Sequence, residues 1–233
     1  MFHKLLKIFQ PTQHISTDAN APVPVTGLYR PYEKPYVNFL YNLLFCDDVA
    51  LFRNQTATSA DGLWPTLVAE HPDLVAIRKI ADDEGNEGRV RALAYHRLRM
   101  SGERVPSKIL LGIIVEVPLR QGLDVLAAFS DGGVRYLNQS GKAAIFEGDA
   151  NPVAALAKEL VAVSRPVVTQ IGPWDKQRLP PPKVGGARLT FLVSDGLYFG
   201  EGPFGTLQLD QMAGPILSKA TQLLQAAVNL STK

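Results

Sequence analysis

The stretch Ile109-Leu-Leu-Gly-Ile-Ile-Val-Glu-Val117, followed directly by Pro118, decides the fold that we expect for this chain. It is a continuous apolar run with several β-branched residues, which is typical of a strand buried on both faces. Proline cannot donate to a neighbouring strand and is expected to end this one. We therefore predict a buried central strand over residues 109–117.

Three short strands are predicted to follow this run. They span residues 123–129, 134–137 and 142–147, and the breaks between them are Asp131-Gly132-Gly133 and Gln139-Ser140-Gly141. Breaks of this length and composition form hairpins. Because hairpin turns join only antiparallel neighbours, we expect an antiparallel sheet.

A similar order of elements is predicted again downstream. Strands are expected at 188–193, 197–199 and 206–209, with turns at 194–196 and 202–205. Each group of strands is followed by an apolar-faced helix that begins at a proline, Pro152 or Pro215. The Ser-Asp-Gly turns begin at Ser130 and Ser194, which are 64 residues apart. This repetition predicts an internal duplication of one β-meander-plus-helix unit with pseudo-twofold symmetry; two unrelated hairpins with the same turn chemistry are the alternative.

The first half of the chain has a helical pattern instead. Within it, residues 89–100 fit either a strand or a helix, and the good helix formers together with Gly102 at a C-cap position favour a helix. Their four arginines form either a phosphate or acidic-partner site, or a solvated face paired with the acidic turn 82–88. The predicted class is α+β with a helical N-terminal half. The duplicated half is expected to form one antiparallel sheet, or two abutting sheets, with the two long helices on one side and the helical half on another edge or face.

The chain divides into five predicted segments. These are an amphipathic start and extended linker (1–31), a helical region (32–104), a first unit of four strands and a helix (105–164), a Pro-rich loop (165–187) and a second unit of three strands and a helix (188–233). Residues 105–233 are expected to form one duplicated domain.

The first ten residues could form a short basic amphipathic helix. Its apolar side would carry Phe2, Leu5, Leu6 and Phe9. Such a helix packs on its own domain or frays, or it docks on a membrane or a partner. No apolar run reaches the ~18–20 residues of a membrane span, and no secretory signal is recognisable. We therefore expect a cytoplasmic protein.

Composition excludes several classes of function. The 233 residues are 46% hydrophobic with a net charge of +2, which excludes a largely disordered chain and a strongly basic one. The single cysteine, Cys46, excludes an internal disulfide, a thiolate zinc cluster and a cysteine-held iron–sulfur centre. The predicted strand regions carry a net negative charge, so nucleic-acid binding on the sheet is not expected.

No catalytic, metal or cofactor motif is recognisable. Residues 200–205 have the glycine spacing of a dinucleotide-binding loop, but they are expected to open a strand rather than a helix. The four histidines lack the spacing of a metal pair. We therefore expect no cofactor, no metal and no recognisable catalytic residue.

Trp174, on the Pro-rich loop, is the best candidate for a binding contact. Trp is an efficient interface anchor; alternatively, its indole folds back onto the sheet and pins the loop. We expect a non-enzymatic binding or protein-interaction module that binds through this loop or the groove between the repeats, with a protein partner or a second copy of the chain. The alternatives are a hydrolase-like small-molecule enzyme, favoured by a pocket holding Asp131, Asp195 or His96 with a shifted pKa, and a peripheral membrane protein.

Overall fold

A computed structural model describes residues 28–58 and 63–231 of the chain. Within them the elements follow in the order α2 (Pro35–Leu43), η2 (Val49–Thr58, a 3₁₀ helix), α3 (Leu63–Val68), α4 (Leu74–Asp82), α5 (Gly88–Met100), β1 (Leu110–Leu119), β2 (Gly122–Phe129), β3 (Val134–Leu137), β4 (Ala143–Phe146), α6 (Ala154–Gln170), β5 (Gly186–Val193), β6 (Gly196–Pro203), α7 (Phe204–Leu209) and α8 (Ala213–Ser231). The predicted helical first half is confirmed, and residues 89–100 are helical.

The strands form one antiparallel sheet in the order β4-β3-β2-β1-β5-β6. The apolar run is the central strand β1, as predicted, but it continues past its predicted end to Leu119. Pro118 still pairs with Leu123 of β2, whereas the pairing with β5 stops at Glu116. Because β1 has no second partner at Pro118, the missing N–H leaves no ladder bond unmade.

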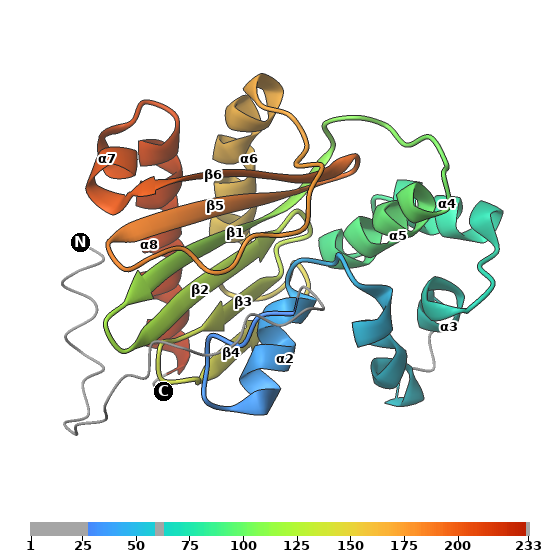
Figure 1. Ribbon diagram of the computed structural model, residues 1–233, viewed down its shortest axis with the longest axis horizontal. Coiled ribbons are helices and arrows are strands. Elements are labelled where there is room, and N and C mark those ends of the chain that lie inside the picture. Colours follow the sequence, from blue (N-terminus) through green and yellow to red (C-terminus); the bar gives the residue numbers. More distant parts are fainter. Residues whose placement is uncertain (1–27, 59–62, 232–233) are drawn as a thin grey trace.

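Helices cover both faces of the sheet. The back cluster joins the sheet to α6 and α8 through buried side chains such as Ile113, Phe191, Leu160 and Leu223. The front cluster joins it to the N-terminal helices through residues such as Tyr41, Leu93, Val125 and Phe129. Figure 1 shows α6 and α8 behind the sheet, α2 in front of it, and α3, α4 and α5 beside the right-hand ends of the strands. The predicted α+β architecture, with both long helices on one side, is therefore confirmed.

The two Ser-Asp-Gly hairpins lie on opposite sides of β1. Both β2 and β5 pair antiparallel with β1, so residues 64 positions apart face opposite sides of the sheet: Val125 belongs to the front cluster and Leu189 to the back cluster. A twofold rotation about the axis of β1 would relate the two hairpins and exchange the faces of the sheet in this way. The same rotation would place α6 and α8 on opposite faces, but both lie on the back face. The pseudo-twofold unit of meander plus helix is not observed, and internal duplication stays a prediction.

The third strand predicted for the second unit is wrong. Residues 206–209 belong to the short helix α7. Their alternation of polar and apolar residues fits a strand, but only Phe204 and Leu207, three residues apart, pack against the back cluster, while Leu209 is exposed. That spacing places the two contacts on one side of a helix.

The Pro-rich loop is shorter than predicted at both ends. Helix α6 continues through Pro166 to Gln170, and β5 begins at Gly186. Proline within a helix removes one hydrogen bond, but Val168 beyond it is buried in the back cluster. This packing keeps the last turns helical, and the loop between the two elements spans residues 171–185.

No helix of the described residues is long and apolar enough to cross a bilayer. The predicted amphipathic start, with Phe2, Leu5, Leu6 and Phe9, lies outside the residues that the structure describes.

Candidate functional site

A cavity of about 420 Å³ lies where the end of α5, the β5–β6 turn and the first part of the Pro-rich loop meet. We call it the Arg99 cleft. It is lined by Leu28, Asp47, Asp48, His96, Arg99, Met100, residues 174–178 and residues 195–197. Residues far apart in the sequence therefore build one site.

The end of α5 supplies one wall of the cleft. Gly102, at a φ of +78°, lets the chain turn out of the helix, and the N–H groups of Gly102 and Glu103 donate to the carbonyls of Arg99 and Leu98 at 3.0 Å each. This is the Schellman arrangement that a C-cap glycine allows. It ends the helix just beyond Arg99, whose guanidinium donates to the Ser194 carbonyl of the β5–β6 turn.

Two ionisable groups of this wall have displaced pKa values. Burial, with the neighbouring Arg99 guanidinium, lowers the pKa of His96 to about 4. Burial also lowers the pKa of Arg99, and the Asp195 carboxylate opposes this effect. At neutral pH the cleft therefore contains a neutral imidazole beside a partly desolvated cation.

The β5–β6 turn is tied to the segment that precedes β1. The Ser194 hydroxyl donates to the Pro106 carbonyl at 2.6 Å and accepts from the Ile109 N–H at 3.1 Å. One oxygen of Asp195 accepts from the Lys108 N–H at 3.2 Å, and the other accepts from the Tyr198 hydroxyl at 3.0 Å. These bonds hold both residues in place and occupy both carboxylate oxygens.

Trp174 folds back onto the sheet and also lines the cleft. Its backbone N–H donates to the Leu197 carbonyl at 2.8 Å, its indole N–H donates to the Gln177 carbonyl at 2.9 Å, and its ring meets Phe199 edge to face with the centroids 5.0 Å apart. The indole therefore folds back and pins the loop, which is the alternative stated for Trp174 in the sequence analysis. The binding role of Trp174 stays a prediction.

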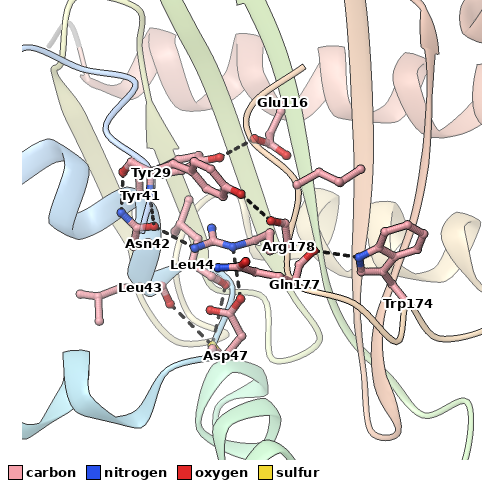
Figure 2. Close-up of polar contacts among 12 residues, drawn as sticks. Tyr29, Tyr41, Asn42, Leu43, Leu44, Asp47, Glu116, Trp174, Gln177 and Arg178 are labelled. Atoms are coloured by element: carbon pink, nitrogen blue, oxygen red, sulfur yellow. Dashed lines mark hydrogen bonds and ion pairs between the residues drawn. The ribbon is translucent and has the colours of Figure 1, made fainter. Parts of the chain in front are cut away.

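Arg178 holds the same loop to the helical layer (Figure 2). Its guanidinium lies 3.8 Å from the centroid of Phe45, pairs with Asp47 at 3.2 Å and donates to Asn42 at 2.8 Å. Its carbonyl accepts from the Tyr29 hydroxyl at 2.6 Å. Burial raises the pKa of Asp47, and the Arg178 charge opposes this effect. The loop is therefore fixed by contacts with both neighbouring layers.

A chain of polar groups, buried except for Glu201, continues beneath the loop. The Tyr41 hydroxyl donates to Glu116 at 2.7 Å, and Glu116 lies 3.8 Å from the Arg188 guanidinium. Arg188 also pairs with Glu201 at 2.5 Å and donates to the Leu179 carbonyl at 3.2 Å. Burial raises the pKa of Glu116, and Arg188 opposes this effect. These groups link the centre of the sheet to the loop.

A second, more open groove lies beside the later part of the loop. Its volume is about 770 Å³, and its lining includes Pro181, Val184 and Phe199. Arg188 and Glu201, which also line it, are already paired with each other. The Arg99 cleft offers more polar groups that could orient a ligand, so we regard it as the candidate site.

Of the three residues considered for a catalytic site, the structure brings two together. His96 and Asp195 both line the cleft, whereas Asp131 accepts from the backbone N–H groups of Gly88 at 2.8 Å and Gly133 at 3.2 Å. Within the described part of the cleft lining, no hydrogen bond joins His96 to a carboxylate or a hydroxyl, and no serine, threonine or cysteine is present. A serine, threonine or cysteine nucleophile paired with His96 is therefore not assembled in this described lining.

Metal-ligating residues do not gather within residues 28–58 and 63–231, where no group of three or more histidine, cysteine or carboxylate side chains could hold an ion. The sequence prediction of no metal site stays a prediction for the whole chain.

Sequence reasoning missed the charged residues that hold the site together. Glu116 is a lone carboxylate within an apolar strand, and a charge there must find a partner when it is buried. That signal pointed to a buried cation but not to Arg188. The sequence placed Arg99 in a basic run at the end of a helix and did not predict its contact with the β5–β6 turn. All four arginines of the run have acceptors inside the protein: Arg89 pairs with Glu87, and the others donate to backbone carbonyls.

No model of a known protein family matches this chain, and a search of curated proteins finds no significant match. The function is therefore inferred from the cleft itself.

Proposed function

We propose that the protein is a non-enzymatic binding protein and that it holds a compact small molecule in the Arg99 cleft. The observation that carries this proposal is the fixed position of the cleft walls: Arg99, Asp195 and Trp174 come from three segments, and each is held by hydrogen bonds to the rest of the protein. The volume of about 420 Å³ falls within the roughly 300–1,000 Å³ of ligand pockets. Walls that are already ordered lose little conformational entropy when a ligand binds.

The pinned loop favours a ligand that enters the cleft over a partner held by a loop that reaches outward. Trp174 already uses its indole N–H within the loop, and Arg178 fastens the loop to the helical layer. A protein partner or a second copy of the chain could still cover this surface, and that interaction belongs to the same proposal of a binding module.

A small-molecule enzyme is the second candidate. It is favoured by the occurrence of His96 and Asp195 in one cleft together with the lowered pKa of His96, because perturbed groups gather at catalytic sites. We favour binding, since the described lining contains no serine, threonine or cysteine that His96 could activate.

Fluorine NMR of the tryptophans tests the binding function directly. The chain has two tryptophans, so labelling a Trp64→Phe variant with 5-fluorotryptophan leaves Trp174 as the only reporter. We expect members of a diverse fragment library to shift this resonance in a saturable way. The matched control is a Trp174→Phe variant, in which the label reports from Trp64. The Trp64 ring stacks on Phe52 with the ring centroids 5.7 Å apart.

Fragments that shift Trp174 and leave Trp64 unchanged would support a ligand site in the cleft. A library without a single such fragment would overturn the proposal.

A cytoplasmic location is part of this proposal. The lone Cys46 is buried, and burial raises its pKa to about 12. Such a thiol is unreactive in any compartment; the support for a reducing one is that a single cysteine cannot form an internal disulfide.

A further inference from the structure

We propose that the ligand of the Arg99 cleft is an apolar carboxylate, with its carboxylate bound by Arg99 and its apolar part against Trp174 and Leu197. This inference rests on the proposed function and adds the chemical class of the ligand. Three features of the cleft support it: most of its carboxylates already have partners within the protein, two of its cations have few, and apolar side chains line the rest of its wall.

Most carboxylates of the cleft are already engaged by the protein. Asp47 is paired with Arg178 at 3.2 Å. Asp195 accepts two hydrogen bonds, one on each oxygen. Asp48 accepts from the Ala50 N–H at 2.9 Å, while Asp175 is exposed. Three of the four are therefore held by partners within the protein, which weakens their attraction for an added cation.

Of the three cations that line the cleft, Arg178 is engaged by Asp47 and Asn42, whereas Arg99 and Lys176 have fewer partners within the described residues. Arg99 has five N–H donors, but its one hydrogen bond within the described residues goes to the Ser194 carbonyl, and no carboxylate there forms an ion pair with it. Partial burial has removed part of its water, as the direction of its pKa shift indicates. A carboxylate that accepts two N–H groups from a guanidinium replaces this lost solvation with charge-assisted hydrogen bonds.

Lys176 adds a second positive charge to the same cavity. Its ammonium lies 5.4 Å from the centroid of the Trp174 ring and is paired with no carboxylate of the described chain. Because Lys176 is exposed, it contributes to attraction at the entrance more than to the bound geometry.

Apolar side chains line the remainder of the cleft. Leu28, Met100, Trp174 and Leu197 all contribute to its wall. The Trp174 ring is held in place by its indole hydrogen bond and by the edge contact with Phe199. A fixed aromatic surface beside a guanidinium is suited to a ligand that has a flat or aliphatic body and one anionic end.

Four probes of simple chemistry test this inference by calorimetric titration of the full chain. Benzoate has the anionic end and the apolar body, benzyl alcohol lacks the charge, benzylamine has the opposite charge, and inorganic phosphate lacks the body. We expect benzoate to bind most tightly, and Arg99→Gln to weaken it roughly tenfold or more through loss of the charge-assisted bonds.

The matched control for Arg99 is Arg97→Gln. Arg97 lies in the same last turn of α5 but donates to the carbonyls of Ala69 and Glu70, away from the cleft. This variant is expected to bind benzoate like the wild type. Should Arg99→Gln fail to fold, Arg99→Lys keeps the charge but loses the planar fork, and a several-fold weaker affinity is then expected.

Several results would overturn the inference. If benzylamine binds as tightly as benzoate, the carboxylates dominate the cleft. If phosphate binds as tightly as benzoate, the apolar body of the ligand contributes nothing to affinity. If the Arg99 and Arg97 variants bind benzoate with equal affinity, Arg99 does not bind the carboxylate. If none of the four probes binds while other fragments shift the fluorine signal of Trp174, the carboxylate class is wrong and the binding function stands. If no fragment shifts that signal, both are wrong.

Discussion

Arg178 lies where a loop without regular structure crosses the helical layer, and it contacts groups of three kinds: an aromatic ring, a carboxylate and an amide. Its partners Asn42 and Phe45 precede it by more than 130 residues in the sequence, and no local pattern relates them. A planar guanidinium suits this position because it stacks and donates at the same time.

Replacing Arg178 by alanine should destabilise the protein by about 2–4 kcal/mol, because the substitution leaves the partly buried Asp47 without its cation and removes the packing on Phe45. Urea unfolding followed by circular dichroism measures this loss. Arg165→Ala is the control, since Arg165 is exposed on α6. Equal losses from the two substitutions would contradict the stabilising role of Arg178.

Asp124 makes stability depend on pH. Burial raises its pKa to about 6, while hydrogen bonds from the Gln139 backbone and the Tyr136 side chain oppose this effect. The unfolded chain has the ordinary value of about 3.9, so the folded protein binds the proton more tightly, and stability is lost as the pH rises from about 4 to about 6.

Asp124→Asn should remove this loss, so that its unfolding free energy relative to the wild type rises by about 2–3 kcal/mol between pH 4 and pH 7. His96 has a lowered pKa and acts in the opposite direction over a similar range, but it is present in both proteins and cancels in the difference. Asp149→Asn, at an exposed position, is the control. A flat difference for Asp124→Asn would contradict the raised pKa.

At this scale the sequence predicted some members of the site but not their assembly. Trp174, His96 and Asp195 were all considered individually, each for its own chemistry. Their meeting depends on how α5, the β5–β6 turn and the loop pack, and side chains such as Arg99 and Ser194 meet only after packing. Periodicity and turn chemistry describe neighbours in sequence, so they contain no information about such contacts.

Among the elements, those with strong local patterns were predicted correctly. The long apolar run became the central strand β1, and the Gly-containing breaks became hairpin turns. Errors occurred where a short segment fits two patterns, as at residues 206–209, or where distant packing overrides a local signal, as at Pro166. A segment of four to six residues is too short for its periodicity to decide.

The C-cap of α5 allows a prediction at the scale of the element. Gly102 has a φ of +78° with no atom within 4 Å of an added Cβ, so Gly102→Ala changes backbone strain alone. We expect a loss of about 1 kcal/mol in unfolding free energy. Gly172→Ala is the matched control, since its Cβ also has open space but its φ is not in the strained region. Thermal unfolding of both variants measures the difference, and equal melting temperatures would contradict the strain.

In the whole molecule, one sheet separates two apolar clusters, and only the back cluster is completed by residues that follow β1. The front cluster needs the N-terminal helices, which cover side chains such as Val125, Phe129 and Leu192. The sheet and the helical region share this cluster, so we expect each to need the other for stability. That residues 105–233 form one duplicated domain stays a prediction.

A fragment of residues 105–233 should therefore bind the dye ANS and lack a cooperative unfolding transition, because the front face of its sheet is exposed. The control is a chain of residues 28–233, which keeps both layers and should unfold cooperatively with little dye binding. A 105–233 fragment that unfolds as sharply as the longer chain would show that the sheet does not need the front layer.

The position of Arg178 in the chain also affects how the protein is made. Tyr41 and Phe45 leave the ribosome before β1 and the loop that contact them, which follow only after many further residues have been translated. During that interval the helices can contact one another, but the sheet that completes the front cluster has not yet been made. Newly made chains should therefore depend on chaperones that shield their apolar surfaces until the loop residues emerge and the front layer closes.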